Sequence, residues 1–304
     1  MLPLVSVVIT TYNRADLVTR RAIRSVRALR YPNLECIVVD DCSTDATAIA
    51  VAGITAEDAR VRYVRTAVNG GISAARNAGI RASAGEYVAF LDDEDEFDPD
   101  YITEMVSFFA GLPASVGAAV TDMRIVYDDG RFGSGVPTAV FWQAGMGNGW
   151  MMRRSVFGEG LWFEEGMRAI EDLDFSMRFS ERFEYRILHK PLFTYYTAAP
   201  SVFRPPLAKK RYADIFMASL DMLFTRHFNA YRRQGVAALA WLYFFKGIHC
   251  CQFGLMRAGK TALWQSFRIK PSLRVVVLLI VSLCGRHAFL FIFGIRSKMR
   301  HYFL

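Results

Sequence analysis

The sequence predicts an α/β protein with a mostly parallel sheet flanked by helices, followed by a helical extension at the C-terminal end. Apolar segments rich in β-branched residues alternate with helical patterns over about the first hundred residues, which is typical of doubly wound sheets. Acidic residues directly follow two of these segments. Beyond residue 204 the chain becomes basic and aromatic, and its apolar residues recur with helical periodicity.

The alternation starts at the N-terminal end of the chain. A strand is predicted over Val5–Thr10, where β-branched residues dominate. A helical pattern begins near Asp16 and is broken at Pro32. A second buried strand follows over Glu35–Val39. Asp41 lies just past the carboxyl end of that strand, which is where open α/β sheets bind their ligands.

A glycine pair follows the third predicted strand. That strand is short, Val61–Val64, and Gly70-Gly71 then opens a helix of small residues. Paired glycines let backbone N–H groups approach an anion at a helix N-terminus, and Arg76 in the second turn is placed to reach a phosphate. The alternative is an ordinary turn with a surface arginine. The chain has no GxGxxG or Walker A motif, which argues against a dinucleotide or NTPase site.

A run of carboxylates follows the fourth strand. The strand, Tyr87–Leu91, is an unbroken apolar and aromatic run, and acidic residues occupy positions 92–96 directly after it. Crowded carboxylates repel one another unless a cation lies among them, and hard oxygen ligands suit Mg²⁺ or Mn²⁺. A cation held in this way keeps open positions for phosphate oxygens. The alternative is a solvated acidic loop before a helix that opens at Pro99.

Four stretches, in this order and at these spacings, resemble the inverting glycosyltransferases of family 2, of the type that builds bacterial envelope polysaccharides. They are Val5–Arg14, Val38–Thr47, Asn69–Asn77 and Tyr87–Pro99. The resemblance implies the GT-A fold, a Rossmann-like, mostly parallel sheet flanked by helices. It also implies a nucleotide-sugar donor, with a UDP-sugar as the first expectation, and inversion at the transferred sugar.

The resemblance also implies which residues bind the donor. Tyr12 would stack on the base and Asp41 would hydrogen-bond it, while Thr10 and Arg76 would lie near ribose or phosphate. The residues expected to bind the nucleotide are Thr10, Tyr12, Asn13, Arg14, Asp41, Arg76 and Asp93.

The implied metal ion, Mg²⁺ or Mn²⁺, would bridge the diphosphate of the donor. Asp93 and Glu94 fall on the family's DXD-type element and are the expected ligands. Glu94 stands where the principal ligand is usually aspartate. Glutamate is still a hard oxygen ligand, but it is one methylene longer, so metal geometry and catalytic competence depend on this position.

The acceptor side is expected in the glycine-rich segment 145–154. By resemblance, Gly147, Asn148, Gly149 and Trp150 would line the acceptor pocket, and for Trp150 a place in the core is an equally good interpretation. Many relatives carry a Tyr-Arg-x-His-x-x-Ser pattern further along. The aligned run here, Tyr195–Ser201, lacks the arginine and the histidine, so no phosphate or metal role is expected for it.

Ile170–Phe175 resembles the family's Glu-Asp element, whose second acid is the general base. Glu171 would then lie on the acceptor side, and Asp172 would be the catalytic residue. Attack on the anomeric carbon requires a nearby carboxylate to take the proton of the acceptor hydroxyl. A helix start also favours the ionised form of Asp172, and the alternative is that this acid only caps the helix.

The charge distribution divides the chain. Residues 1–200 carry 20 Lys+Arg against 27 Asp+Glu, a balance of −7, whereas residues 201–304 carry 17 against 2, a balance of +15. We therefore expect a catalytic domain over 1–204 and a helical, basic extension over 205–304. Such an extension favours an anionic membrane surface, and nucleic acid is not expected because no recognition motif accompanies the charge.

Helical patterns are expected over 213–224 and 236–256, and the apolar run 275–283 is too short to cross a bilayer. We therefore expect helices at the membrane interface, and the alternative is that they pack on the catalytic domain. The N-terminus enters a strand without a signal segment, which predicts a cytoplasmic protein peripheral on the inner face of the membrane. The acceptor would be a saccharide, and a lipid-linked one is favoured.

Two other functions would also involve a sugar nucleotide. A sugar-nucleotide pyrophosphorylase needs a glycine-rich loop with arginine and lysine after the first strand, and Thr10–Arg14 contains no glycine or lysine. A degenerate, membrane-bound sugar-nucleotide binder without transferase activity remains the alternative, because of Glu94 and the missing histidine.

Overall fold

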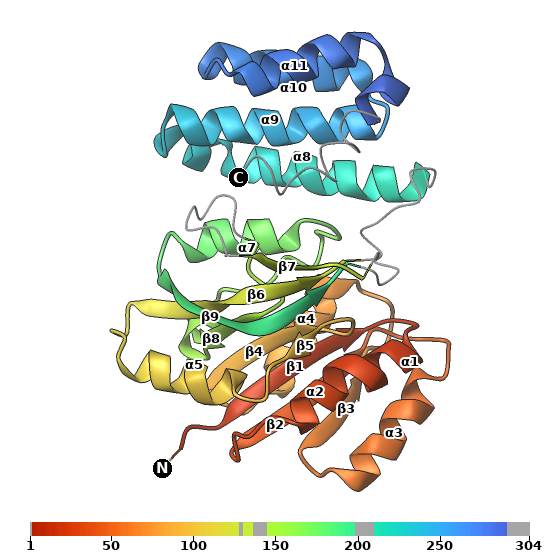
Figure 1. Ribbon diagram of the computed structural model, residues 1–304, viewed down its shortest axis with the longest axis vertical. Helices are drawn as coiled ribbons and strands as arrows, with labels where there is room; N and C mark the ends of the chain where they lie inside the picture. The colour runs from red at the N-terminus through yellow and green to blue at the C-terminus, as the bar shows by residue number, and fades with distance from the viewer. Residues whose placement is uncertain (1, 128–129, 136–144, 198–209, 291–304) are drawn as a thin grey trace. The chain divides into compact units, whose positions relative to one another are not determined.

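The structure is a computed structural model that describes residues 2–127, 130–135, 145–197 and 210–290. The chain divides into two compact units, Met1–Arg204 and Pro205–Leu304, which we call unit 1 and unit 2. Unit 1 is α/β, and the described part of unit 2 is helical (Figure 1).

Unit 1 is built on a mixed sheet, with nine strands in its described residues. The strand order is β3-β2-β1-β4-β8-β6-β9-β5, and β7 pairs with β6 outside this path. The strands are β1 (Val5–Thr11), β2 (Leu34–Asp40), β3 (Val61–Arg65), β4 (Tyr87–Asp92), β5 (Glu96–Phe97), β6 (Val116–Val126), β7 (Phe132–Gly135), β8 (Trp150–Arg153) and β9 (Glu184–Tyr196).

The first four strands are parallel, as the sequence predicts. β1 pairs in parallel with β2 and β4, and its register places Thr10 beside Val39 and Asp92. The carboxyl ends of these strands therefore share one edge of the sheet. The rest of the sheet is mixed rather than parallel, because β8 runs antiparallel to both β4 and β6 while β9 is parallel to β6.

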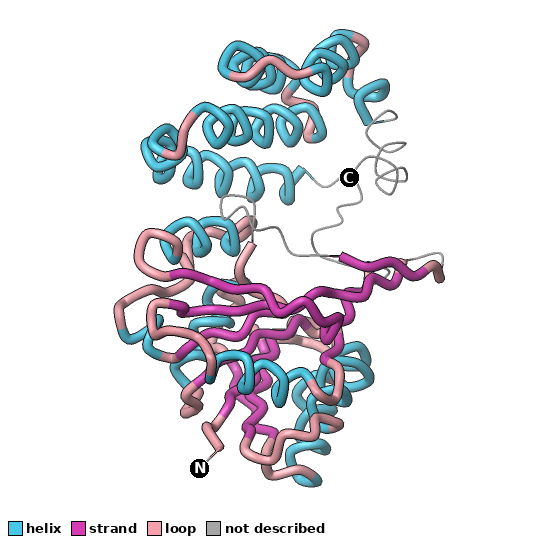
Figure 2. The backbone as a smooth tube through the Cα atoms, turned by 60° about the vertical axis from the view of Figure 1, so that its left-hand side comes forward, coloured by secondary structure: helices cyan, strands magenta, loops and turns pink. Residues whose placement is uncertain are grey.

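Helices cover both faces of the sheet in unit 1 (Figure 2). Successive side chains of a strand point to opposite faces, so Val7 and Ile9 join one core and Val8 joins the other. The first core is covered by α1 (Ala15–Val18), the π-helical turn η1 (Thr19–Ile23), α2 (Arg24–Arg27), α3 (Thr47–Glu57) and α5 (Tyr101–Ala110). The second core is covered by α4 (Ile72–Ala82), α6 (Ser155–Gly158) and α7 (Glu171–Phe179).

β6 and β7 form a hairpin around Gly130, with Val126 paired to Phe132. Asp128 and Asp129, between these two strands, lie outside the described residues, as do residues 198–201 of the run Tyr195–Ser201.

Unit 2 contains four helices in its described residues, and α10 is one that the sequence patterns did not predict. Gly254, with φ of 87°, separates it from the preceding helix. Ser272 caps the last of the four by accepting a hydrogen bond from the N–H of Val275 at 3.3 Å. The helices are α8 (Lys210–Arg233), α9 (Val236–Gln252), α10 (Met256–Ile269) and α11 (Leu273–Leu283). Among the described residues, no helix combines the length and the apolarity that crossing a bilayer requires.

Candidate functional site

The acidic residues after β4, which we call the acid loop (residues 92–96), lie at the shared carboxyl edge of the parallel strands. Both oxygens of Asp93 are hydrogen-bonded: Thr11 Oγ1 donates to Oδ2 at 2.7 Å and Arg14 Nη1 donates to Oδ1 at 2.9 Å. Arg14 Nη1 also donates to Glu94 Oε2 at 2.8 Å. A single guanidinium group thus pairs with both expected metal ligands.

Residues distant in sequence hold the acid loop in place. Arg21, in the π-helical turn η1, donates to the main-chain oxygen of Glu94 at 2.9 Å and lies 3.9 Å from the centre of the Tyr196 ring. The N–H of Tyr196 donates to Asp95 Oδ1 at 2.7 Å, and Asn148 Nδ2 donates to Asp95 Oδ2. A π-helical turn within a helix is frequent at functional sites, and here it carries the arginine that contacts the loop.

Burial makes ionisation of the loop unfavourable. It raises the pKa of Asp93 to about 6, although Arg14 and Thr11 act in the opposite direction. The pKa values of Glu94 and Asp95 are raised as well, first by burial and further by the charge of Asp92. A cation bound here would therefore stabilise the ionised carboxylates.

Arg76 connects the acid loop with α7. It is 3% exposed, and its guanidinium donates to Glu171 Oε1 at 2.8 Å and to Asp92 Oδ1 at 3.3 Å. Gly147 lies directly against this group, since a Cβ added there would come within 2.8 Å of Arg76 Cζ. Arg76 was expected near ribose or phosphate; in the structure it pairs with the buried Glu171 and the partly buried Asp92, and its role toward a donor stays a prediction.

Asp172 lies in the first turn of α7, where its Oδ1 accepts a hydrogen bond from the N–H of Leu173 at 2.8 Å. Its neighbour Glu171 is buried, and Glu171 Oε2 has no hydrogen-bond partner among the described residues. Burial raises the pKa of both carboxyl groups, and Arg76 opposes this in each case. Gly145 leaves room for Asp172, because a Cβ there would lie 2.1 Å from Oδ2.

Two expected nucleotide-binding side chains are hydrogen-bonded within the protein. Asp41 accepts the N–H groups of Gly70 and Gly71 at 2.9 and 2.8 Å, so it shapes the glycine turn before α4. Asn13 Oδ1 accepts the N–H of Thr44 at 2.7 Å. These contacts order the turns at the edge of the sheet.

Other expected residues remain open to a ligand. The side chain of Tyr12 is 43% exposed, and Thr10 is partly exposed at the end of β1.

Two residues expected on the acceptor side are held within the protein. Asn148 Oδ1 accepts the N–H of Asp92 at 2.9 Å, which places this residue beside the acid loop. Trp150 is buried in β8 and packs against Tyr185 with ring centres 5.3 Å apart, so it occupies the core, the alternative that the sequence left open.

Two residues of the site were not predicted. Asp92 ends β4, and its Oδ2 accepts no hydrogen bond from the described residues; as the first acid after an apolar strand it could have been included. Arg168 is exposed and donates to the main-chain oxygen of Asn69 at 3.0 Å, beside the start of α4. Arg168 thus adds a cation beside a helix N-terminus, where anions bind. The one sequence signal for its presence in the site is its position four residues before Asp172.

The residues of the site fit a divalent cation that binds together with a diphosphate. Over the described ranges, no three His, Cys, Asp or Glu side chains converge as a metal site. Mg²⁺ and similar ions, however, are commonly held by one or two carboxylates together with substrate phosphates. Glu94 Oε1 and Asp92 Oδ2 make no hydrogen bond to the described residues, whereas both oxygens of Asp93 are engaged.

A mixed sheet covered on both faces, with an acid loop at the edge of its parallel strands and a carboxylate at the start of α7, defines the GT-A class of fold. Residues 6–147 match the family model described as glycosyl transferase family 2. The chain therefore contains a family-2 glycosyltransferase domain, which confirms the resemblance seen in the sequence.

Curated relatives are named for polysaccharide biosynthesis. The chain is 41% identical over 129 residues to the succinoglycan biosynthesis protein ExoO of Rhizobium meliloti (strain 1021), covering 42% of this chain and 36% of the relative. It is 39% identical over 101 residues to the putative colanic acid biosynthesis glycosyl transferase WcaA of Escherichia coli (strain K12), covering 33% and 36%. It is 34% identical over 128 residues to the putative teichuronic acid biosynthesis glycosyltransferase TuaG of Bacillus subtilis (strain 168), covering 42% and 50%. The chain thus spans about a third to a half of these relatives.

Solved structures share the fold at low identity. S. aureus TarS 1-349 in complex with UDP-GlcNAc superimposes with a TM-score of 0.65 at 18% identity, covering 94% of this chain and 89% of that one. The mannosyltransferase PcManGT from Pyrobaculum calidifontis, in complex with GDP-Man and Mn²⁺, gives 0.59 at 19% identity, covering 93% and 80%. At this identity the similarity supports the fold alone.

Proposed function

We propose that this protein transfers a sugar from a nucleotide diphosphate sugar to a hydroxyl group of a saccharide acceptor, with inversion at the anomeric carbon. The observation that carries the proposal is the pairing of the acid loop with α7 through Arg76, which contacts Asp92 and Glu171. The charge of Arg76 also acts on Asp172, the candidate base, which supports a common site for the proposed diphosphate-side acid and the proposed base.

Asp172 is the proposed general base. As the acceptor hydroxyl attacks the anomeric carbon, the carboxylate takes its proton, and the diphosphate leaves from the opposite face of the sugar. Direct displacement of this kind inverts the configuration. Burial raises the pKa of Asp172, which makes its carboxylate a stronger base than that of an exposed aspartate. Glu171, paired with Arg76, keeps the first turn of α7 in place.

Glu94 and Asp92 are the proposed ligands of Mg²⁺ or Mn²⁺, with Asp93 holding Arg14 and Thr11 beside them. When bound, the metal ion would neutralise charge on the leaving diphosphate. Tyr12 and Thr10 remain proposed contacts for the nucleotide, and Arg168 is added as a cation for the phosphates. A UDP-sugar is the favoured donor, since UDP-GlcNAc and UDP are named with TarS.

One observation favours the alternative, a sugar-nucleotide binder without transferase activity. Arg14 already pairs with Asp93 and Glu94, so the acid loop is partly neutralised by the protein itself. The two functions are separated by incubating purified protein with Mn²⁺ and labelled UDP-sugars and GDP-sugars, with and without oligosaccharide acceptors. Transfer or slow donor hydrolysis supports the enzyme. Binding of UDP without either reaction, across the donors, supports the binder.

We further propose that unit 2 binds the cytoplasmic face of an anionic membrane and that the acceptor is lipid-linked. The outer face of α11 is apolar: Leu273, Val277, Ile280 and Leu283 are all exposed. A helix that is apolar all round requires burial in a core or a membrane. Its inner face already packs on Ile248 and other residues of the unit 2 core.

Cations surround the start of this apolar face. Arg268 and Lys270, at the end of α10, and Arg274, in the first turn of α11, are exposed. Basic residues near an anionic lipid surface contribute about 1 kcal/mol each. A short apolar helix flanked by cations suits the interface rather than a span, because the 11 residues of α11 are too few to cross a bilayer.

A further inference from the structure

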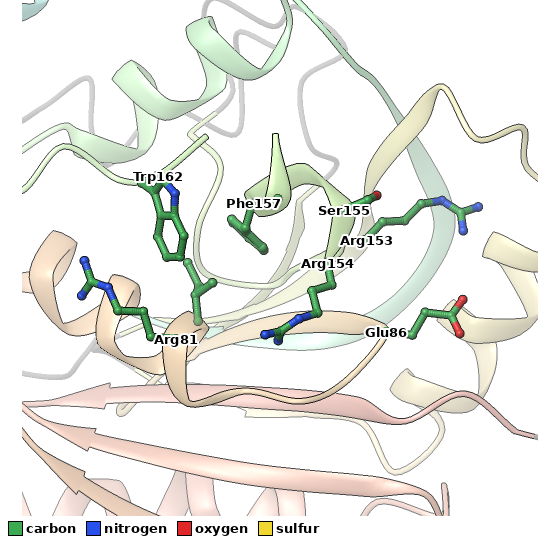
Figure 3. Close-up of a pocket in the computed structure, with 9 residues that line it drawn as sticks. Arg81, Glu86, Arg153, Arg154, Ser155, Phe157 and Trp162 are labelled. Carbon is green, nitrogen blue, oxygen red and sulfur yellow. The ribbon is translucent and has the colours of Figure 1, made fainter. Parts of the chain in front are cut away.

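A cavity of about 650 Å³ lies in unit 1 (Figure 3), and none of its lining residues belongs to the acid loop. Glu86, at its rim, directly precedes β4, and Arg153 is the register partner of Tyr87, the first residue of that strand. Asp92 ends the same strand, so the cavity and the acid loop are separated by about 17 Å of strand at roughly 3.3 Å per residue. The lining residues are Ile80, Arg81, Glu86, Arg153, Arg154, Ser155, Phe157, Gly158 and Trp162.

One wall of the cavity is apolar and aromatic. Trp162 is partly exposed and its ring lies 6.2 Å from that of the buried Phe157, with 45° between the planes. Ile80 at the end of α4 completes this wall. Partly exposed indole surface is suited to the apolar face of a ring that also carries polar groups at its edge.

The other wall is cationic, as Figure 3 shows for Arg81 and Arg154. Arg154 Nη1 donates to the main-chain oxygen and the hydroxyl of Ser83, while its Nε and Nη2 make no hydrogen bond to any residue that the structure describes. Arg81 lies 5.3 Å from the Trp162 ring centre and pairs with Glu165 at the surface. These donors match a carboxylate, which a guanidinium binds in bidentate fashion.

The remaining charged groups of the lining leave a net positive cavity. Arg153 is committed to the fold, since it donates to the main-chain oxygens of Val116 and Phe109 at 3.1 and 3.2 Å. Glu86 is exposed and is the one acid of this lining. The volume exceeds by far the ~30 Å³ share of a single water, so the space suits a ring-sized ligand rather than one small ion.

We propose that this cavity is a second saccharide site, which binds an acidic sugar residue of the acceptor chain with its ring against Trp162 and its carboxylate on Arg154. The inference rests on the proposed function, because a transferase that extends an acidic glycan meets such residues along its acceptor. The segment that carries Trp162 continues to Phe163, whose N–H and C=O are both bound by Asn77 of α4. The second site is thus built on the same helix that carries Arg76.

The test uses the full-length protein and isothermal titration with a tetraglucuronate, with a neutral glucose tetrasaccharide as comparison. Gly158→Leu adds a large side chain at a lining position without removing a contact, because a Cβ at Gly158 meets no atom within 4 Å. Gly53→Leu on α3 is the matched control, since it too has no atom within 4 Å and lies outside the cavity lining. Arg154→Gln removes the free donors.

We expect the tetraglucuronate to bind at least tenfold more tightly than the neutral tetrasaccharide. Gly158→Leu and Arg154→Gln should each weaken it at least tenfold, and Gly53→Leu should not. Equal affinity for the neutral sugar, equal affinity for inorganic phosphate, or binding unaffected by Gly158→Leu would overturn the proposal. If Arg154→Gln fails to fold, the Gly158→Leu and Gly53→Leu pair still decides it. UDP binding is measured on each variant, so loss of the donor function is seen separately.

Discussion

Glu171 and Asp172 are adjacent acids in different surroundings. The buried Glu171 is ion-paired with Arg76, and a residue held in this way stabilises the start of α7. Among the described residues, the side chain of Asp172 accepts only the N–H of Leu173, through Oδ1, and its Oδ2 lies next to Gly145. A carboxylate with an available oxygen is the one that can accept a proton from an acceptor.

Asp172→Asn should reduce turnover by roughly 10²–10⁴, the usual contribution of general-base catalysis, because the amide cannot take the proton. UDP affinity should hardly change, since the proposed base would contact the acceptor and not the donor. Single-turnover kinetics and UDP titration measure the two effects, with Glu181→Gln at an exposed position as the control. An Asn variant with near-normal turnover, or a product of retained configuration by NMR, would contradict the assignment.

Glu94→Gln should abolish the Mn²⁺-dependent part of UDP affinity, while Glu94→Asp should retain much of it. The amide keeps the hydrogen bond geometry toward Arg14 but loses the charge that a cation requires. Titration calorimetry with and without Mn²⁺ provides the measurement. Unchanged Mn²⁺ dependence in the Gln variant would show that Glu94 is not a metal ligand.

At the scale of single elements, the glycine-rich segment before β8 is shaped by what lies beneath it. Gly147→Ala should place a methyl group within 3 Å of the Arg76 guanidinium, which is held by two ion pairs. The shift should lower turnover by up to about 10²-fold, the cost of roughly 1 Å of misplacement. Gly53→Ala, where a Cβ meets nothing, is the control. Equal turnover in the two variants would show that Arg76 does not position the site.

His249 on α9 provides a pH prediction for unit 2. It packs against Phe216 and Phe245, with ring centres 4.6 and 4.4 Å away, and burial lowers its pKa to about 4. Between pH 6.5 and 4 the unfolded chain binds more protons than the folded one, so the free energy of unfolding decreases as the pH falls, by at most about 3 kcal/mol. Calorimetry from pH 7.5 to 4.5 should show this loss, and His249→Phe should reduce it. An identical pH profile for that variant would refute the prediction, with His287→Gln as the exposed control.

At the scale of the whole molecule, the two units differ in net charge and in the apolar side chains that they expose. Ile280→Glu, at a position 58% exposed on α11, should reduce flotation with anionic vesicles severalfold, because it places a charge in the apolar face. Ile49→Glu in unit 1, at a position 79% exposed, is the matched control and should float like the unaltered protein. Salt should weaken flotation, and neutral vesicles should bind less.

Equal flotation of the Ile280→Glu and Ile49→Glu proteins would show that the outer face of α11 does not contact lipid. Sedimentation analysis without vesicles tests the alternative, in which a second copy of the chain packs on this apolar face. If the unaltered protein is a dimer and Ile280→Glu is a monomer, the face joins two copies of the chain instead.

Much of unit 1 was predictable from local sequence. β-branched runs marked β1 and β2, and an apolar, aromatic run marked β4. The acids after β4 and the Glu-Asp pair at α7 marked the two ends of the candidate site. Each of these signals is set by neighbours in the chain, so it can be recognised without the fold. The match of residues 6–147 to the family 2 model spans the same local motifs.

Only the tertiary structure decided which charges meet. Arg14 pairs with Asp93 and Glu94, 79 and 80 residues away, and Arg76 pairs with Glu171, 95 residues away. The antiparallel direction of β8 and the burial of Trp150 also depend on strands far apart in sequence. Sequence patterns determine which segments become strands and where acids follow them. Ion pairing and strand direction arise only when the sheet brings distant segments within hydrogen-bond distance, and no local pattern encodes that distance.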